Sequence, residues 1–206
     1  KVARDIILGG GYDNNLLCIG EKQVFAVGAA FDKLMAAMQR AGSKLVSSNQ
    51  LDTIRKEVFT FREGDGGCSQ AVVNSEFIGV DASKLAAVAG VNVDNRTELL
   101  IAETGADDLF VVKEQMTTLL PIIRCGDFDE AVGLAYESEH GFKHSAIVHT
   151  MNVANMTKMG RKMDTSVFVK NGPCVAGLGM GGEGYISFSI ATATGEGITT
   201  PKTFTR

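Results

Sequence analysis

The 206-residue chain is predicted to form an α/β domain with three layers (αβα), in which helices cover both faces of a largely parallel sheet. The carboxyl-terminal half carries this prediction, because apolar runs typical of strands alternate there with segments of helical periodicity. The runs are 145–149 and 165–169, and the helical segments are 127–135 and 153–163. This order favours parallel pairing, since each helix returns the chain across the sheet. Apolar residues make up 45% of the chain, enough for one sizeable core.

The other elements are predicted from shorter patterns. Apolar side chains at helical spacing predict helices over 31–38, 47–58 and 81–89, the second of them capped by Ser47 or Ser48. Short apolar or alternating runs predict further strands, at 99–102, at 109–112, from Pro121, at 185–190 and at 203–206. Glycines at positions 64, 66 and 67 predict a turn-rich connection between the second and third helices.

Charge and cysteine spacing exclude several classes of protein. The formal net charge is −4, so the chain lacks the basic surface that nucleic acids or anionic membranes attract. It has no apolar run of the roughly 18 to 20 residues that span a bilayer, and residues near Lys1 show neither the cationic start nor the apolar stretch that a signal peptide is expected to have. The four cysteines stand about fifty residues apart without a CxxC pair. We therefore expect no nucleic-acid partner, no membrane, no disulfide scaffold and no metal site.

Two motifs at the carboxyl-terminal end need a structural context. Gly177 to Gly182 satisfies GxGxxG, which binds dinucleotides when it joins a strand directly to a helix. Here Pro173 separates it from the preceding strand, and the residues that follow alternate like another strand, so we expect no dinucleotide fingerprint. Glu183 and Glu196 each lie between glycines and are interpreted either as surface carboxylates or as acceptors that order this glycine-rich loop.

The candidate nucleophile is Cys18, which follows a segment rich in Gly, Asp and Asn that predicts an exposed turn before a helix. Unpaired N–H groups at such a position stabilise a thiolate and can hold an oxyanion. From spacing alone, an inert buried cysteine is the favoured interpretation of Cys18, and it is also the one adopted for Cys68, Cys125 and Cys174. His144, at the start of a predicted strand, is a candidate general base, whereas Glu114 has ordinary solvation as its default role.

Three segments taken together resemble the CoA-acylating aldehyde dehydrogenases, above all the propionaldehyde and acetaldehyde dehydrogenases of bacterial microcompartments. The segments are Asp13-Asn-Asn-Leu-Leu-Cys-Ile-Gly-Glu-Lys22, Gly141-Phe-Lys-His-Ser-Ala146 and Ser166 to Gly179. Gly181 to Gly184 and Thr194 to Gly197 fit as well, while Leu17 stands where relatives often have proline. The resemblance implies that residues 1–206 form the catalytic domain of an aldehyde dehydrogenase-like fold, and that the NAD-binding domain and the oligomerisation extension are absent.

The resemblance also implies roles for individual residues. Cys18 matches the nucleophile that carries an acyl thioester, and His144 matches a histidine of the CoA-acylating branch. Glu114 falls where the superfamily places a carboxylate against the nicotinamide ribose, and Met116 falls where an aromatic residue often lines the same pocket. For the substrate pocket we expect a lining that consists of Pro173, Cys174 and Val175.

The function that the resemblance implies is the conversion of a short-chain aldehyde, NAD and CoA to acyl-CoA and NADH. The complete protein is expected to be a cytoplasmic homo-oligomer, and its enclosure in a bacterial microcompartment is left open. This chain alone is expected to have negligible dehydrogenase turnover. Two alternatives stay open: a non-catalytic assembly or binding fragment of the same fold, and a hydrolytic aldehyde dehydrogenase that releases free acid.

Overall fold

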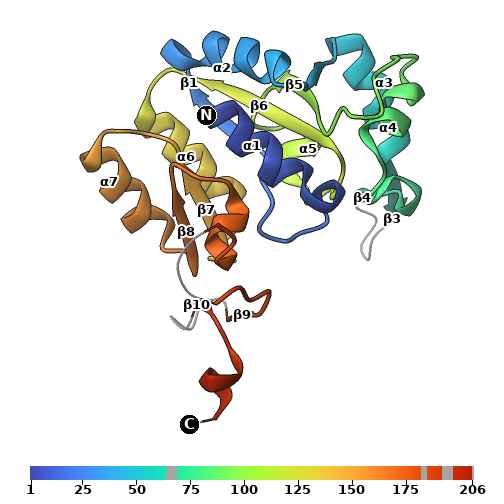
Figure 1. The fold of residues 1–206 in the computed structure, drawn as a ribbon. Coiled ribbons are helices and arrows are strands. Elements are labelled where there is room, and N and C mark those ends of the chain that lie inside the picture. Colours follow the sequence, from blue (N-terminus) through green and yellow to red (C-terminus); the bar gives the residue numbers. More distant parts are fainter. Residues whose placement is uncertain (64–68, 182–184, 192–196, 206) are drawn as a thin grey trace.

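The computed structural model describes residues 1–63, 69–181, 185–191 and 197–205 (Figure 1). The predicted glycine turn at 64–67 lies outside these residues, and so do Cys68, Glu183 and Glu196. None of the helices within the described ranges is both long and apolar enough to cross a membrane.

A four-stranded parallel sheet forms the centre of the molecule, in the order β1-β6-β5-β2. The strands are β1 (Val24–Val27), β2 (Lys44–Leu45), β5 (Leu100–Thr104) and β6 (Leu119–Cys125). A second parallel pair consists of β7 (Ser145–Val148) and β8 (Val167–Lys170). Helix α6 (Phe128–Ser138) connects β6 to β7, and α7 (Val153–Met163) connects β7 to β8. The predicted alternation of strands and helices is thereby confirmed.

Helices cover both faces of the four-stranded sheet (Figure 1). On one face, Ile101 and Ile122 pack against α1 (Val2–Gly11) and α2 (Gly28–Arg40). On the other face, Leu100 and Leu119 pack against α3 (Ser48–Val58) and α4 (Ala82–Val88). Because neighbouring residues of a strand point to opposite faces, this division of β5 and β6 between two clusters identifies the three predicted layers.

Three local predictions are wrong. Residues 109–112 form a short helix, α5 (Leu109–Val112), because the Asp108 side chain accepts a hydrogen bond from Phe110 N–H at 2.9 Å and caps it. Of the run 185–190 only Ile190 is in a strand, β9 (Ile190–Ala191), which pairs antiparallel with β10 (Gly197–Ile198). Near the carboxyl end, Pro201–Phe204 form the 3₁₀ helix η4 instead of a strand, consistent with proline at the first helical position.

Several elements were not predicted at all. They are α1, the antiparallel hairpin of β3 (Phe59–Glu63) and β4 (Ser69–Val73), and the 3₁₀ helices η1 (Tyr12–Asn15), η2 (Ser75–Phe77) and η3 (Cys174–Leu178). Two of these, α1 and η3, lie against each other. Residues of η3 also pack against Leu17 and Ile19, which flank Cys18.

Substituting Ser47 by alanine is expected to lower the free energy of unfolding by about 1 kcal/mol. Its hydroxyl accepts a hydrogen bond from Gln50 N–H, and the Gln50 side chain accepts one from Ser47 N–H at 2.8 Å, so both partners of a capping box are present. Urea unfolding would measure the loss. Ser48→Ala, one position further into the same exposed helix end, is the matched control, and equal losses in both variants would contradict the capping role.

Candidate active site

The turn that carries Cys18 begins with three successive residues in left-handed conformation. Asp13, Asn14 and Asn15 have φ values of 49°, 52° and 67°, which Asp and Asn tolerate better than other side chains. The buried Asn15 amide donates hydrogen bonds to Gly10 O at 2.7 Å and to Glu21 O at 2.9 Å. One side chain thus holds both ends of the turn, and Cys18 projects from it as an exposed thiol.

The expectation that Cys18 precedes a helix is wrong. Gly20 N–H bonds to Leu17 O at 3.0 Å, which closes a turn around the cysteine, and the next element is β1. A turn closed in this way has no row of unpaired helical N–H groups, so a helix dipole does not stabilise charge at this sulfur.

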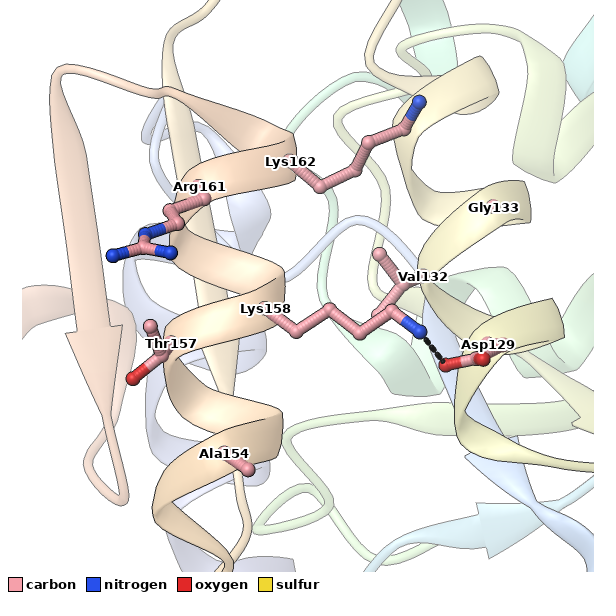
Figure 2. A pocket seen from close by; sticks show the side chains of 8 residues that line it. All are labelled: Asp129, Val132, Gly133, Ala154, Thr157, Lys158, Arg161 and Lys162. Carbon is pink, nitrogen blue, oxygen red and sulfur yellow. Dashed lines mark hydrogen bonds and ion pairs between the residues drawn. The ribbon is translucent and has the colours of Figure 1, made fainter.

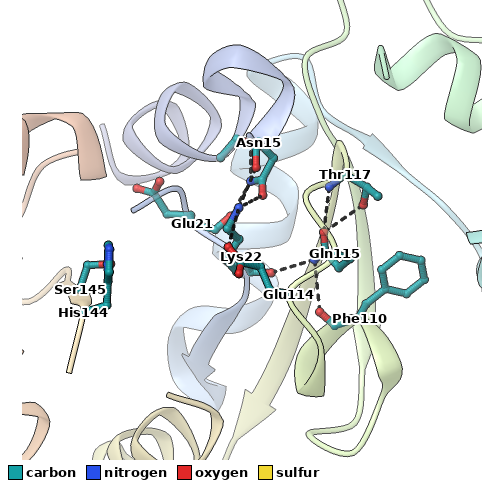
Figure 3. A network of polar contacts seen from close by, with 10 residues as sticks. Asn15, Glu21, Lys22, Phe110, Glu114, Gln115, Thr117, His144 and Ser145 are labelled. Atoms are coloured by element: carbon teal, nitrogen blue, oxygen red, sulfur yellow. Dashed lines mark hydrogen bonds and ion pairs between the residues drawn. The ribbon is translucent and has the colours of Figure 1, made fainter. Parts of the chain in front are cut away.

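Lys22 supplies the cation near this turn (Figure 3). Its Nζ donates to Asn15 O and to Asn15 Oδ1, each at 2.7 Å, and lies 3.9 Å from Glu114 Oε1. Burial lowers the pKa of Lys22, while the charges of Glu114 and Cys18 act in the opposite direction. A largely buried ammonium group therefore lies between residues 13–20 and the carboxylate of Glu114. Residues 13–20 are called the nucleophile turn below, after the predicted role of Cys18.

The buried Gln115 fixes the backbone beside Glu114. Its Nε2 donates to Phe110 O at 3.3 Å and to Lys22 O at 3.5 Å, and its Oε1 accepts from Thr117 N–H at 3.0 Å. Glu114 itself is 57% exposed, so its carboxylate is accessible to a ligand. Met116 follows with φ of 47°, and its carbonyl accepts from Gly79 N–H at 3.0 Å.

His144 lies at the start of β7 and is half-buried. Its backbone N–H donates to Glu139 Oε1 at 2.9 Å, and its Nδ1 lies 3.1 Å from Ser145 Oγ. The serine hydroxyl can donate to or accept from this nitrogen, so both tautomers of the imidazole are compatible with the contact. Figure 3 places His144 and Ser145 apart from the Lys22 network, across the cavity described next.

A cavity of about 950 Å³ connects these groups. It lies between β1, at the edge of its sheet, and β7, with α1 and α6 on its two sides. Cys18, Lys22, Glu114 and His144 all line it, close to the amino ends of the two strands. The structure thus brings together the predicted nucleophile, the predicted base and the predicted cofactor-binding carboxylate.

The other predicted site residues lie elsewhere. Pro173, Cys174, Val175 and Met116 are not among the described residues that line this cavity. Cys174 and Val175 are buried with Ile19, directly behind the nucleophile turn. Their assignment to a substrate pocket, like that of Met116, stays a prediction.

A second groove, of about 810 Å³, lies between α6 and α7 and contains none of the predicted site residues (Figure 2). Lys158 of α7 pairs there with Asp129 of α6 at 2.5 Å, and Arg161 and Lys162 extend from the same helix. Over the described part of the chain, no group of three or more His, Cys, Asp or Glu side chains could hold a metal ion.

Comparison with known proteins identifies relatives of this chain in sequence and in structure. No family model matches the chain. The acetylating acetaldehyde dehydrogenase EutE of Salmonella typhimurium is 39% identical over all 206 residues. The propionaldehyde dehydrogenase of Rhodopseudomonas palustris, solved with bound CoA and an acylated cysteine, is 36% identical over the whole chain with a TM-score of 0.90. Over its whole length, the chain is thus similar to CoA-acylating aldehyde dehydrogenases.

The match covers only part of each relative. This chain corresponds to 44% of EutE and to 45% of the Rhodopseudomonas enzyme. An engineered glycolyl-CoA reductase with bound NADP⁺ is also 36% identical to the chain, with a TM-score of 0.90, and 45% of its length is covered. The chain therefore spans less than half the length of these CoA-acylating relatives.

Four polar residues that hold the nucleophile turn and the segments beside it were not predicted from the sequence: Asn15, Glu21, Lys22 and Gln115. The first three lie within the motif around Cys18, but they were given no role of their own. A signal was present, since a Glu-Lys pair directly before an apolar strand is an unusual place for two charges. Both turn out to be largely buried, with 5% of Glu21 exposed and 14% of the Lys22 side chain.

Replacing Lys22 by methionine is expected to slow alkylation of Cys18 by iodoacetamide at pH 7 by roughly tenfold. The substitution removes a positive charge that interacts with Cys18 and leaves the two Asn15 acceptors without their donor. Peptide mass spectrometry after timed alkylation would give the rate at Cys18. Lys113→Met is the matched control, because Lys113 lines the same cavity but is exposed. Unchanged alkylation in Lys22→Met would refute the electrostatic role.

Proposed function

We propose that Cys18 carries an acyl group as a thioester while the complete protein converts a short-chain aldehyde, NAD and CoA to acyl-CoA and NADH. The single observation that carries this proposal is the convergence of Cys18 and His144 on one cavity. A relative 36% identical to the chain binds CoA and has an acylated cysteine, which supports the same chemistry here.

The proposed reaction starts at the Cys18 sulfur. The thiolate attacks the aldehyde carbon, and the thiohemiacetal oxyanion that forms can accept a hydrogen bond from the Cys18 backbone N–H. Collapse of this oxyanion expels hydride and leaves the acyl thioester on Cys18. NAD, when bound, supplies the acceptor for that hydride. The exposed Glu114 carboxylate on the cavity rim suits the hydroxyl groups of its ribose, which need acceptors.

His144 is proposed to act in the second half of the reaction. Its imidazole can act as a general base and take the proton from the CoA thiol, whose sulfur then attacks the thioester carbon and displaces the Cys18 thiolate. With Nδ1 next to the Ser145 hydroxyl, Nε2 is the nitrogen left to receive this proton. Water in place of CoA would give free acid, so the ratio of acyl-CoA to acid among the products separates this proposal from a hydrolytic enzyme.

In the full-length protein, His144→Ala is expected to slow acyl transfer to CoA by about 100-fold, and reduction of NAD in a single turnover by much less. Rapid-quench and stopped-flow measurements would give the two rates separately. His140→Asn is the control, because His140 lines the same cavity but is exposed. Equal loss of both steps in His144→Ala would indicate a structural role instead.

The decisive experiment is intact mass spectrometry after brief incubation with propionyl-CoA. The reverse half-reaction, transfer of the acyl group from CoA to the cysteine, needs no NAD. We expect one propionyl adduct, located on Cys18 and removed by excess CoA. The experiment is run on this chain and on the full-length protein. An adduct on another cysteine, or no adduct on the full-length protein, would overturn the proposal.

A further inference from the structure

Behind the nucleophile turn lies a buried carboxyl group to which the proposed reaction assigns no step. Glu21 is 5% exposed. Its Oε1 accepts a hydrogen bond from Cys174 N–H at 3.0 Å, across 153 positions of sequence. Its Oε2 is buried and has no hydrogen-bond partner within the described residues. A buried carboxylate oxygen without a donor is costly in its charged form, so this arrangement favours the protonated carboxyl group.

Three segments of the chain meet at this carboxyl group. A Cβ atom at Gly9, near the end of α1, would lie 2.0 Å from Glu21 Oε2, so only glycine leaves room there. The Cys174 thiol, at the start of η3, lies 3.5 Å from Gly9 O as its donor. Glu21 itself belongs to the segment between the nucleophile turn and β1. The carboxyl group therefore joins α1, η3 and the nucleophile segment.

The same residue is bonded to the turn through its backbone. Glu21 O accepts the hydrogen bond from the Asn15 amide at 2.9 Å, and the adjacent Lys22 donates to Asn15 O and Oδ1. Cys18 lies between these two anchors, Asn15 and Glu21. Movement of the Glu21 backbone would consequently change the position of the thiol.

We propose that Glu21 is a positioning residue for Cys18, whose protonated carboxyl group holds the nucleophile turn against α1 and η3, and whose ionisation releases that turn. Protonation leaves Oε1 as the acceptor of Cys174 N–H and removes the negative charge from the unpartnered Oε2. Ionisation places charge on an oxygen that only water can then solvate, which requires the three segments to separate. The proposal rests on the proposed function only in that it takes Cys18 as the nucleophile.

The groups around Glu21 place its ionisation near neutrality. Burial raises the pKa of Glu21 to about 7, the hydrogen bonds from Cys174 act in the opposite direction, and the charge of Asp5 on α1 adds to the increase. Lys22 contributes a cation to the adjoining network, and Lys1 pairs with Asp5 at 2.8 Å. Burial together with Glu21 raises the pKa of the Cys174 thiol. The thiol of Cys174 thus stays protonated and remains a donor throughout the range in which Glu21 titrates.

The test is amide hydrogen exchange of the peptide that covers residues 12–22, measured at pH 6 and pH 8 and corrected for the intrinsic pH dependence of exchange. In the unmodified protein we expect this peptide to lose protection by about tenfold at pH 8 relative to pH 6, because Glu21 is then mostly ionised. In Glu21→Gln, which keeps the shape and cannot ionise, protection should be the same at both pH values. Glu57→Gln, in an exposed helical position, is the matched control.

Each outcome decides the proposal. A purely structural role would make Glu21→Gln less protected than the unmodified protein by the same factor at both pH values, and this would overturn the proposal. If the variant fails to fold, the unmodified protein alone tests the proposal. Equal protection of its residues 12–22 at pH 6 and pH 8 would overturn the proposal as well. The α3 peptide, residues 48–58, serves as the internal reference. No acyl-CoA is used, so failure here is distinct from failure of the thioester proposal.

Discussion

Replacing Cys18 by serine is expected to slow formation of the acyl-protein from an acyl-CoA by at least about 10⁴-fold. A serine hydroxyl is ionised far less than a thiol near neutrality, so it is a much weaker nucleophile than the thiolate. The substitution is nearly isosteric, and Cys18 is exposed, so the turn held by Asn15 and Lys22 should persist. The loss therefore measures chemistry and not folding.

The measurement is the rate at which intact mass increases by one acyl group in the full-length protein. Cys125→Ser is a control of a different kind, because Cys125 is buried and lies outside the cavity, so the variant should keep the acylation rate as long as it folds. Retained acylation in Cys18→Ser would show that another side chain is the nucleophile. Cys68, which lies outside the described residues, would be the next candidate to substitute.

The second large effect concerns the pH dependence of stability. The pKa of Glu21 is raised to about 7 in the folded state, compared with an ordinary value of 4.5. Between these two values the folded protein binds more protons than the unfolded chain, so stability falls as pH rises. The contribution of the protonated group is fully present below about pH 4.5 and is lost as pH rises through 7. From pH 5 to pH 8 the expected loss is about 2 to 3 kcal/mol.

Glu21→Gln should remove this dependence, since an amide does not titrate. Urea unfolding at pH 5 and pH 8 would give the free energies, and the difference between the two pH values is compared between the proteins. Glu57→Gln is expected to behave like the unmodified protein, because its side chain is exposed. Parallel curves for Glu21→Gln and the unmodified protein would contradict the raised pKa.

The sequence by itself determined the architecture where the elements are long and periodic. Segments predicted at 127–135, 145–149, 153–163 and 165–169 correspond to α6, β7, α7 and β8 within a few residues. Short apolar runs did not distinguish strands from helices. The four residues of α5 are too few to show a period, and its capping by Asp108 decided in favour of a helix. Helix α1 was missed because Gly9, Gly10 and Gly11 disfavour helix locally, although its apolar residues pack against the sheet.

The motifs likewise indicated the resemblance to CoA-acylating aldehyde dehydrogenases and gave the candidate reactive groups, which are Cys18, His144 and Glu114. Only the tertiary structure decided that these three line one cavity, since they come from a turn, a strand start and a loop that lie 30 to 126 positions apart. It alone paired Glu21 with Cys174 across 153 positions. The physical reason is that burial and through-space charge depend on which segments pack together. A local pattern gives the identity of a side chain, whereas its pKa and its partners follow from neighbours that are remote in the sequence.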